Sequence, residues 1–455
     1  MEFQNFLLIF VVTITSIPLS LGRPGSENIQ PLFLTSLIRT NGIDQARQAA
    51  QVKNLPNAPQ LLSYAGYLTV NQTTNANLFF WFFPSENKNA PVTVWLQGGP
   101  GSPSTFGLFQ ENGPFVVHPD MSVSFRNYSW ASMYSMLYID QPVGTGFSFT
   151  DSEEGYVNNQ EEVARDLYHF LQQFFEMFPE QLPNELWITG ESYGGRYVPA
   201  IAYKLFQERA TSKMNLKGLA IGNGFIDGAT QSNYADLLYE IGMFDEHEHH
   251  QGHKYEKKIE KYGKEKEYKK CYKVISQYVL GDNNVTSLFF NATGSKNFYD
   301  FTKINSKDDS SSTYLARQDV RTAINVGNRT MSDGSKVSEH LLEDICKNVK
   351  PWLEELLNEK YQVLLYNGQL DIIVAPALTE RLIQHLHWEG AHEYKKSVKK
   401  IWRLQDEPDD VAGYIRSHGN FHYVVVRNAG HMVPTYQPKA SYELLKKFTA
   451  GELDG

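Results

Sequence analysis

A series of short apolar segments limits what this chain of 455 residues can fold into more than any other feature does. Most residues in these segments are apolar, whereas a strand with one solvated face would alternate apolar with polar residues. Such runs are typical of strands that are buried on both faces of a sheet. We expect strands at residues 78–83, 92–96, 135–139, 186–189, 216–222, 361–366 and 421–426.

Between these segments, apolar residues recur at the spacing of a helix. In residues 158–178, one helical face collects Val163, Leu167, Phe170, Leu171, Phe174 and Phe178. Asn158 or Asn159 can cap the helix, and glutamates occupy its first turn. Because strands alternate with helices, the sequence predicts a largely parallel sheet of the α/β class.

The alternation stops in the middle of the chain. Residues 246–270 interleave glutamates with lysines, which favours a solvated helix face over a basic binding patch, and residues 305–313 are typical of a surface loop. We therefore expect a core of residues 61–227 and 351–455, with residues 228–350 inserted as a lid over the carboxyl edge of the sheet. The lid is either a surface structure or a segment whose cleavage activates a zymogen.

The N-terminus carries an apolar run from Phe6 to about Leu21, which ends in small residues. The run is marginal for crossing a bilayer, so we expect residues 1–22 to be a cleaved signal peptide rather than a membrane anchor, although the usual positive residues are missing. Residues 23–60 would then form an N-terminal extension. We expect no stable membrane anchor elsewhere.

Five Asn-x-Ser/Thr sequences support entry into the secretory pathway, with a secreted, lysosomal or yolk-granule destination. The candidate glycosylation sites are Asn71, Asn127, Asn284, Asn291 and Asn328. A formal net charge of −9 argues against a nucleic-acid partner, which would favour a basic surface.

The chain has two cysteines, Cys271 and Cys346, and they can form at most one intramolecular disulfide. In an oxidising compartment we expect them to pair; two buried free thiols are the alternative.

A serine between two glycines follows one of the expected strands. The sequence Gly190-x-Ser192-x-Gly194 lies between that strand and an amphipathic segment, and a strand–turn–helix junction of this kind exposes a nucleophile. The serine needs a base and an acid that orients the base. Asp371 and His431 each follow a later strand, and the chain order Ser, Asp, His is that of the α/β-hydrolase fold, with a mostly parallel central sheet.

The glycine-rich segment WLQGGPGSPS follows the strand at 92–96. By itself it could be a plain turn. Its occurrence together with the three catalytic candidates favours an oxyanion hole formed by the backbone N–H groups of Gly99 and Tyr193.

Four histidines lie close together in the charged segment, at His247, His249, His250 and His253. Pairs four residues apart on a helix can share a metal ion, but the sequence shows no nearby cysteine and no defined carboxylate partner. We therefore expect no metal and no organic cofactor.

Six motifs together resemble the serine carboxypeptidase family from about Ser63 to Phe448. They are WLQGGPGSPSTFGLFQENGPF, YIDQPVGTGFSF, ITGESYGGRYVPAIA, IGNGFIDG, YNGQLDIIV and NAGHMVP. Within that family, the glutamine of WLQGGPG and the upstream SYAGYLTVN resemble the branch of the vitellogenic and vitellogenic-like carboxypeptidases.

The resemblance implies a protease that acts on the C-termini of peptides or proteins. It assigns recognition of the terminal carboxylate to Gln97, Gly98, Glu111 and Glu191. When two carboxyl groups pack together, ionising both costs free energy because the two charges repel. They therefore share a proton, and one of them can donate a hydrogen bond to a carboxylate. Activity is then expected to be favoured at acid pH. A solvent-facing Glu191 is the alternative.

Three departures from the family pattern bear on substrate preference. Gln97 replaces the usual asparagine, Ser102 replaces a cysteine that anchors this loop in many relatives, and Pro103 replaces a small residue. Rival functions are an acyltransferase or lyase on the same site, and a storage or binding glycoprotein without activity. The preferred terminal residue and a possible homodimer stay open.

Overall fold

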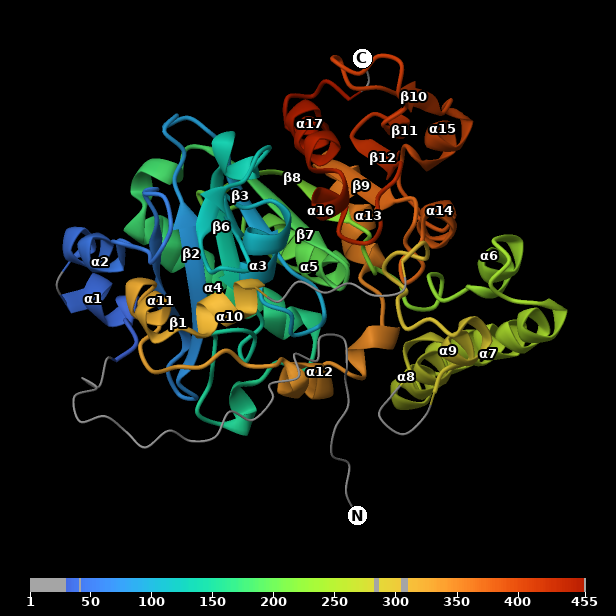
Figure 1. Ribbon diagram of the computed structural model, residues 1–455, viewed down its shortest axis with the longest axis horizontal. Helices are drawn as coiled ribbons and strands as arrows, with labels where there is room; N and C mark the ends of the chain where they lie inside the picture. Colours follow the sequence, from blue (N-terminus) through green and yellow to red (C-terminus); the bar gives the residue numbers. More distant parts are fainter. Residues whose placement is uncertain (1–29, 41, 282–285, 304–309, 454–455) are drawn as a thin grey trace.

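The computed structural model describes residues 30–40, 42–281, 286–303 and 310–453. A ten-stranded mixed sheet lies at its centre (Figure 1). Across the sheet the strands are β1 (Tyr64–Asn71), β2 (Ala76–Phe83), β6 (Ser135–Asp140), β3 (Val92–Leu96), β7 (Glu185–Glu191), β8 (Asn215–Gly222), β9 (Gln362–Gly368), β12 (Phe421–Val426), β11 (Gly413–His418) and β10 (Lys400–Trp402). Strands β6, β3, β7, β8, β9 and β12 are parallel, and the strands at both edges are antiparallel.

Each of the seven predicted strand segments forms a strand of this sheet, so the prediction of a largely parallel α/β fold is confirmed. Strand β2 shows why the apolar runs are continuous. All of its residues are buried: Phe80 packs into the hydrophobic layer on one face, and the adjacent Trp81 packs into the layer on the other face.

Helices cover both faces of the sheet. The layer that contains Phe80 includes residues from α1 (Leu34–Thr40), α2 (Ile43–Ala50), α4 (Gln160–Met177), α5 (Gly194–Gln207), α13 (Lys350–Asn358) and α14 (Pro376–Gln384). The opposite layer includes residues from α17 (Pro438–Thr449). The predicted helix at 158–178 is α4, and the side chain of Asn159 caps it by accepting a hydrogen bond from the N–H of Glu162.

Smaller elements complete the core. They are α3 (Ser104–Phe106), a two-stranded sheet of β4 (Phe115–Val117) and β5 (Val123–Phe125), α15 (Ala391–Lys396) and α16 (Val433–Tyr436). None of the helices in the described ranges combines the length and the hydropathy needed to cross a bilayer.

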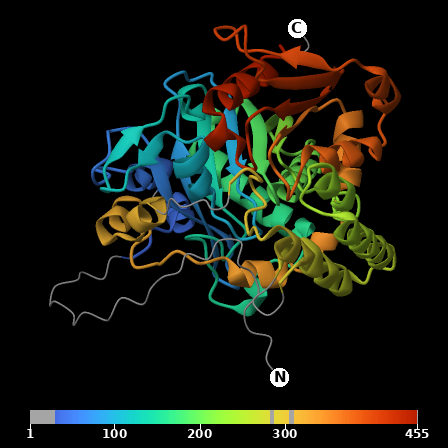
Figure 2. The same ribbon diagram turned by 45° about the vertical axis from the view of Figure 1, so that its right-hand side comes forward.

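The chain between residues 228 and 350 is divided between two places (Figures 1 and 2). Four helices lie together on one side of the molecule: α6 (Ala235–Glu240), α7 (Glu246–Lys264), α8 (Tyr268–Ile275) and α9 (Leu288–Thr293). On the other side, α10 (Ser310–Ala316) and α11 (Gln318–Ala323) lie near the N-terminal helices, and α12 (Ser335–His340) leads back to the core. The N–H of Leu32 donates to the carbonyl oxygen of Asn325 (3.0 Å), which ties this second part to the start of the described chain.

The two cysteines lie in different parts of this interval. Cys271 on α8 and Cys346 in a 3₁₀ turn (Asp344–Cys346) form a disulfide that joins positions 75 residues apart. Of the candidate glycosylation sites, Asn127, Asn291 and Asn328 are exposed and Asn71 is half-buried, whereas Asn284 lies outside the described residues. The predicted signal peptide also lies outside them.

Candidate active site

Ser192 lies in the tight turn between β7 and α5 and has a positive φ of 60°. The turn is pressed against the end of β3. A Cβ atom added to Gly190 or to Gly194 would lie 2.6 Å from the carbonyl oxygen of Leu96, so a larger residue would push the two strands apart. The turn thus holds the Ser192 hydroxyl at the carboxyl edge of the sheet.

Asp371 and His431 meet at the same edge. Asp371 follows β9, His431 follows β12, and Nδ1 of His431 lies 2.8 Å from Oδ2 of Asp371. Both side chains are almost fully buried, with 3% of the histidine and none of the aspartate exposed. Nδ1–H donates to the carboxylate, so the lone pair of Nε2 is left to act as a base. Nε2 is itself buried and has no hydrogen-bond partner among the described residues.

Asn223 fixes the carboxylate from the side, a contact that the sequence motifs did not reveal. Its Nδ2 donates to Oδ2 of Asp371 (2.6 Å), and its Oδ1 accepts from the N–H of Gly368 (3.1 Å). The N–H of Val374 also donates to Oδ2 of Asp371 (3.2 Å). This asparagine lies in the motif IGNGFIDG, directly after β8. Its position at the carboxyl end of a strand could have indicated a role in the site.

Tyr299, from the interval between α9 and α10, packs against the histidine. The two ring centroids are 5.1 Å apart, and the N–H of His431 donates to the carbonyl oxygen of Tyr299 (2.8 Å). A Cβ atom on Gly430 would lie 2.5 Å from that same oxygen, so a glycine must precede the histidine here. Nothing in the sequence pattern placed Tyr299 at the site.

The glycine-rich loop after β3 lies directly against the serine turn. A Cβ atom on Gly98 would lie 2.6 Å from the amide nitrogen of Tyr193 and 2.7 Å from the carbonyl oxygen of Glu191. Gly99 has a φ of +110°, which favours glycine. In the described part of the chain, neither the N–H of Gly99 nor that of Tyr193 donates to a protein acceptor. Both donors are therefore available for a negatively charged oxygen near Ser192.

The loop is held without the disulfide that the family pattern places here. The hydroxyl of Ser338 on α12 donates to the carbonyl oxygen of Pro100 (2.8 Å). A Cβ atom on Gly101 would lie 2.6 Å from the carbonyl oxygen of Gly334, so the two backbones are in contact. The segment around α12 thus anchors the loop by packing.

Glu191 and Glu111 form a buried carboxyl pair beside the serine. Each is 1% exposed, and the charge of Glu111 acts on Glu191. Among the described residues, neither oxygen of Glu111 nor Oε2 of Glu191 has a hydrogen-bond partner, so a proton held between the two carboxyl groups would satisfy them. Burial raises the pKa of Glu191 well above its usual range, and the charge of Glu111 raises it further. Burial also raises the pKa of Glu111, and this effect outweighs the opposing influence of the neighbouring Glu191 and Gln97 side chains. The pair therefore keeps a proton at a pH where exposed glutamates have lost theirs.

Gln97 completes this group. Its Nε2 donates to Oε1 of Glu191 (3.2 Å), and its Oε1 accepts from Nε1 of Trp95 (2.8 Å). The extra methylene relative to asparagine is thus accommodated, and the amide keeps its donor directed at Glu191. Gly107 opens the space for this contact, because a Cβ atom there would lie 2.2 Å from Nε1 of Trp95.

Arg126 positions the turn that carries Glu111, a role that the sequence did not indicate. Glu111 ends a π-helical turn (Gly107–Glu111), and Arg126 donates to the carbonyl oxygens of Gly113 (3.1 Å), Phe115 (3.2 Å) and Phe109. Burial lowers the pKa of Arg126, and the charge of Glu111 opposes this.

A second buried network lies behind the serine turn. Nε of Arg196 is 3.1 Å from Oδ2 of Asp344, and the hydroxyl of Tyr193 donates to the same oxygen (2.9 Å). Gln160 donates to it as well (2.7 Å). Asp344 comes from the end of the inserted interval, so this network fixes the residue after the serine to the part of the chain that carries Cys346.

The structure thus brings all the predicted catalytic and carboxylate-binding residues to one edge of the sheet. A serine turn, a buried carboxylate–histidine pair and two adjacent backbone donors define a serine hydrolase of the α/β-hydrolase fold. The sequence comparisons specify the family. Residues 54–451 match the serine carboxypeptidase family, Peptidase S10, and the chain belongs to this family.

Relatives match over most of their length. The probable serine carboxypeptidase CPVL of Rattus norvegicus is 47% identical over 427 residues, which cover 92% of this chain and 89% of the relative. The venom serine carboxypeptidase of Apis mellifera is 44% identical, with coverage of 92% and 91%. The vitellogenic carboxypeptidase of Aedes aegypti is 42% identical, with coverage of 94% and 91%. The resemblance to the vitellogenic branch is confirmed.

A solved structure shows the same fold. The prohormone-processing carboxypeptidase Kex1Δp of Saccharomyces cerevisiae superimposes with a TM-score of 0.76 and covers 89% of this chain and 96% of its own. Its sequence identity is 24%, so this likeness is one of fold.

Proposed function

We propose that this serine carboxypeptidase releases the C-terminal amino acid of peptides through an acyl-enzyme on Ser192, and that it works best at acid pH. One observation carries the proposal: the buried Glu111–Glu191 pair, with its raised pKa, lies beside the serine turn. A protonated carboxyl at this place donates a hydrogen bond to the terminal carboxylate of a peptide, whereas two ionised carboxylates would repel it.

The chemistry follows from the positions of the side chains. Nε2 of His431 accepts the hydroxyl proton as Oγ of Ser192 bonds to the carbon of the last peptide carbonyl, and the N–H groups of Gly99 and Tyr193 stabilise the resulting oxyanion. Asp371 holds the imidazole and stabilises its positive charge. The imidazolium then protonates the leaving amine, the C–N bond breaks and the terminal amino acid departs.

Water completes the cycle. It attacks the ester carbon while His431 takes one of its protons, and the same proton returns to Oγ of Ser192 as the C–O bond breaks. Gln97, Gly98 and the carboxyl pair hold only the terminal carboxylate, so the enzyme cleaves one residue from a free C-terminus.

The pH dependence follows from the direction of the pKa shift. Because the pair's upper pKa is raised, the proton is present at acid pH and is lost as the pH rises through that value. Affinity for peptides should then fall as the pH rises, while a substrate without a terminal carboxylate should not show this fall.

The test uses N-blocked dipeptides at about pH 5 and pH 7.5, with Ser192→Ala as the matched inactive variant. Release of the C-terminal amino acid that is faster at the lower pH and absent in the variant supports the proposal. Release that is equal or faster at the higher pH contradicts the acid preference. Product analysis separates hydrolysis from acyl transfer, and a fluorophosphonate that fails to label Ser192 would indicate a non-catalytic protein.

We also propose that residues 228–350 form the lid of this site. Three contacts support it: Tyr299 packs on His431, Ser338 holds the glycine-rich loop, and Asp344 binds Arg196. Limited proteolysis within the interval, followed by the dipeptide assay, tests whether the lid must be cleaved or must stay intact for activity.

For location, we propose the secretory pathway, in a secreted or lysosomal-type compartment. The apolar N-terminal run, the exposed sequons and the Cys271–Cys346 disulfide support it. A mobility shift on removal of N-linked glycans from the expressed protein checks it; a chain that keeps its N-terminal residues and carries no glycan contradicts it.

A further inference from the structure

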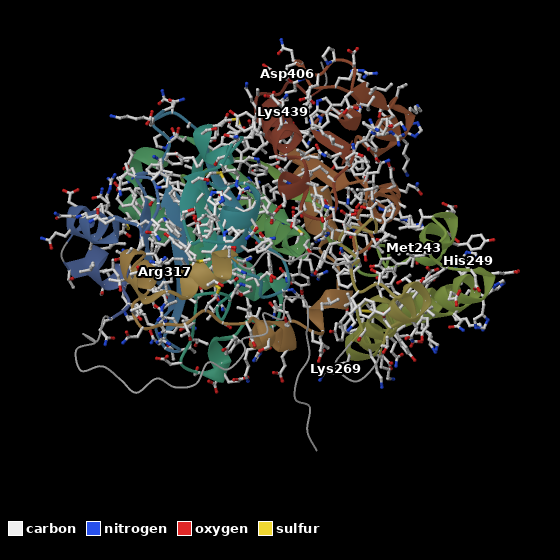
Figure 3. The ribbon with its side chains drawn as sticks, in the orientation of Figure 1. Met243, His249, Lys269, Arg317, Asp406 and Lys439 are labelled. Atoms are coloured by element: carbon white, nitrogen blue, oxygen red, sulfur yellow. A yellow bond between two sulfur atoms is a disulfide. The ribbon has the colours of Figure 1, made fainter. Side chains whose placement is uncertain are left out.

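Helices α6 and α7 bring three metal-ligating atoms together outside the catalytic site. Asp236 lies on α6, and His249 and His253 lie one turn apart on α7. Oδ1 of Asp236 is 2.9 Å from Nε2 of His249 and 3.3 Å from Nε2 of His253, and the two nitrogens are 3.1 Å apart. The cluster is open to solvent, since 47% of the Asp236 side chain is exposed. Figure 3 places His249 between these helices, at the side of the molecule opposite the N-terminal helices.

The three distances between the ligand atoms are compatible with one metal ion bound by all three side chains. Zinc binds nitrogen and oxygen ligands at about 2.0–2.2 Å in a tetrahedron, which separates neighbouring donor atoms by about 3.3 Å or slightly more. The observed triangle of 2.9, 3.1 and 3.3 Å needs to open by only a few tenths of an ångström. Three protein ligands would leave the fourth position to water.

Neighbouring side chains orient the ligand His253. Nδ1 of His253 lies 2.8 Å from Oε2 of Glu256, and Oε1 of Glu256 accepts from the N–H of Ala235 (2.8 Å) and the hydroxyl of Tyr278 (3.0 Å). Glu256 is therefore fixed, and it accepts a hydrogen bond from Nδ1–H of His253. The lone pair of Nε2 then faces the cluster, as in the carboxylate–histidine–metal arrangement of zinc sites.

The carboxylate ligand is oriented as well. Arg381 on α14 donates from Nη2 to Oδ2 of Asp236 (3.0 Å) and from Nη1 to the carbonyl oxygen of Asn233 (2.7 Å). Oδ1 is left to face the two imidazoles. His249 stacks on Tyr239, with ring centroids 4.7 Å apart, which fixes the plane of its ring.

An ion pair without metal is the alternative. In that arrangement one Nε2–H can donate either to the other Nε2 (3.1 Å) or to Asp236, but not to both, so the lone pairs of two of the three atoms still face each other. A bound ion satisfies both nitrogen lone pairs and the carboxylate at once. Because imidazole and carboxylate donors together suit zinc and similar ions, the chemistry of the ligands selects that class.

We propose that Asp236, His249 and His253 bind a divalent transition-metal ion of the zinc type, oriented by Glu256 and Arg381. The ion is structural: it joins α6 to α7, and through Arg381 it couples both helices to α14 of the core. This site is independent of the proposed catalytic mechanism.

The experiment titrates the full chain with Zn²⁺ and with Co²⁺, whose visible absorption reports tetrahedral coordination. His249→Gln and His253→Gln are compared with His247→Gln and His250→Gln, matched changes on the same helix. Among the described contacts, Nδ1 of His250 bonds to the carbonyl oxygen of Glu246 and its ring lies edge-on to that of His249 (6.1 Å), while His247 contacts Gln251, so neither has a contact with Asp236. We expect one ion per chain, a rise in Tm of a few degrees with saturating Zn²⁺, and affinity at least tenfold weaker in the first pair of variants only.

Two results would overturn the proposal. One is the absence of saturable binding of Zn²⁺ up to about 100 µM, where even a weak site of about −5.5 kcal/mol is half-filled. The other is binding that persists unchanged in His249→Gln and His253→Gln while the folded state, checked by Tm without metal, is intact.

Discussion

Two carboxylate–histidine pairs in this molecule have almost the same length and opposite surroundings. Asp371 and His431 are 2.8 Å apart with 0% and 3% of their side chains exposed, whereas Asp236 and His249 are 2.9 Å apart with 47% and 23% exposed. Burial strengthens the field of the first carboxylate on its histidine, and the hydrogen bond at Nδ1 leaves Nε2 free to act as a base. Exposure leaves the second pair open to an ion from solvent. The distance alone therefore does not define the chemistry.

The largest effect should come from breaking the buried pair. Asp371→Asn removes the charge that orients and stabilises the imidazolium, so kcat should fall by about 10⁴-fold with little change in fold. The matched control is Glu153→Gln, because Glu153 and His340 form a pair of 2.9 Å whose carboxylate is exposed. Steady-state hydrolysis of an N-blocked dipeptide measures both variants, and equal losses would mean that burial is not what distinguishes the pairs.

The same contrast applies to two arginine–aspartate pairs. Arg196–Asp344 (3.1 Å) is fully buried, and Arg381–Asp236 (3.0 Å) is partly exposed. Asp344→Asn leaves a buried guanidinium without its counter-charge and should destabilise the protein by about 3–5 kcal/mol. Asp236→Asn should cost no more than about 1 kcal/mol. Denaturant unfolding without added metal measures both, and a reversed order would contradict the comparison.

A third test compares two carboxyl groups on one strand. Glu191 ends β7 in the buried pair, whereas Glu185 begins it with 42% of its side chain exposed. Glu191→Gln removes the titrating proton, so kcat/KM for peptides at pH 5 should fall by about tenfold to a hundredfold, and the decline towards pH 7.5 should flatten. Glu185→Gln should leave the pH profile unchanged. A Glu191→Gln enzyme with the normal profile would exclude the shared-proton account.

The smallest expected effect is a change in stability, and it comes from comparing substitutions at two glycines. Gly263 on α7 has open space, since an added Cβ atom would meet only the Cβ of Ala229 at 3.8 Å. Gly263→Ala should therefore stabilise the protein by up to about 1 kcal/mol through helix propensity. Gly98→Ala should instead destabilise the protein, because the added Cβ atom would lie 2.6 Å from the amide nitrogen of Tyr193. Thermal unfolding measures the change in stability of each variant. Changes of the same sign would mean that the space around the glycine does not determine the effect.

The sequence by itself determined the central strands and the order of the candidate catalytic residues. Strands buried on both faces must be apolar throughout, and functional side chains must follow them at the carboxyl edge, so both features leave a local signature. The edge strands β1, β10 and β11 were not predicted. One reason is that β10 has only three residues and β11 buries only part of its length, so neither forms a continuous apolar run.

Only the tertiary structure decided which distant groups meet. Asn223 on Asp371, Tyr299 on His431 and Arg126 behind Glu111 are contacts between segments far apart in the chain, and no periodicity encodes them. The histidines of α7 show this most clearly. Their helical spacing was visible in the sequence, but the carboxylate that completes the cluster comes from α6, and packing of the two helices brings it within 3.3 Å. A spacing along one helix is a local property, whereas a ligand set depends on how two helices pack.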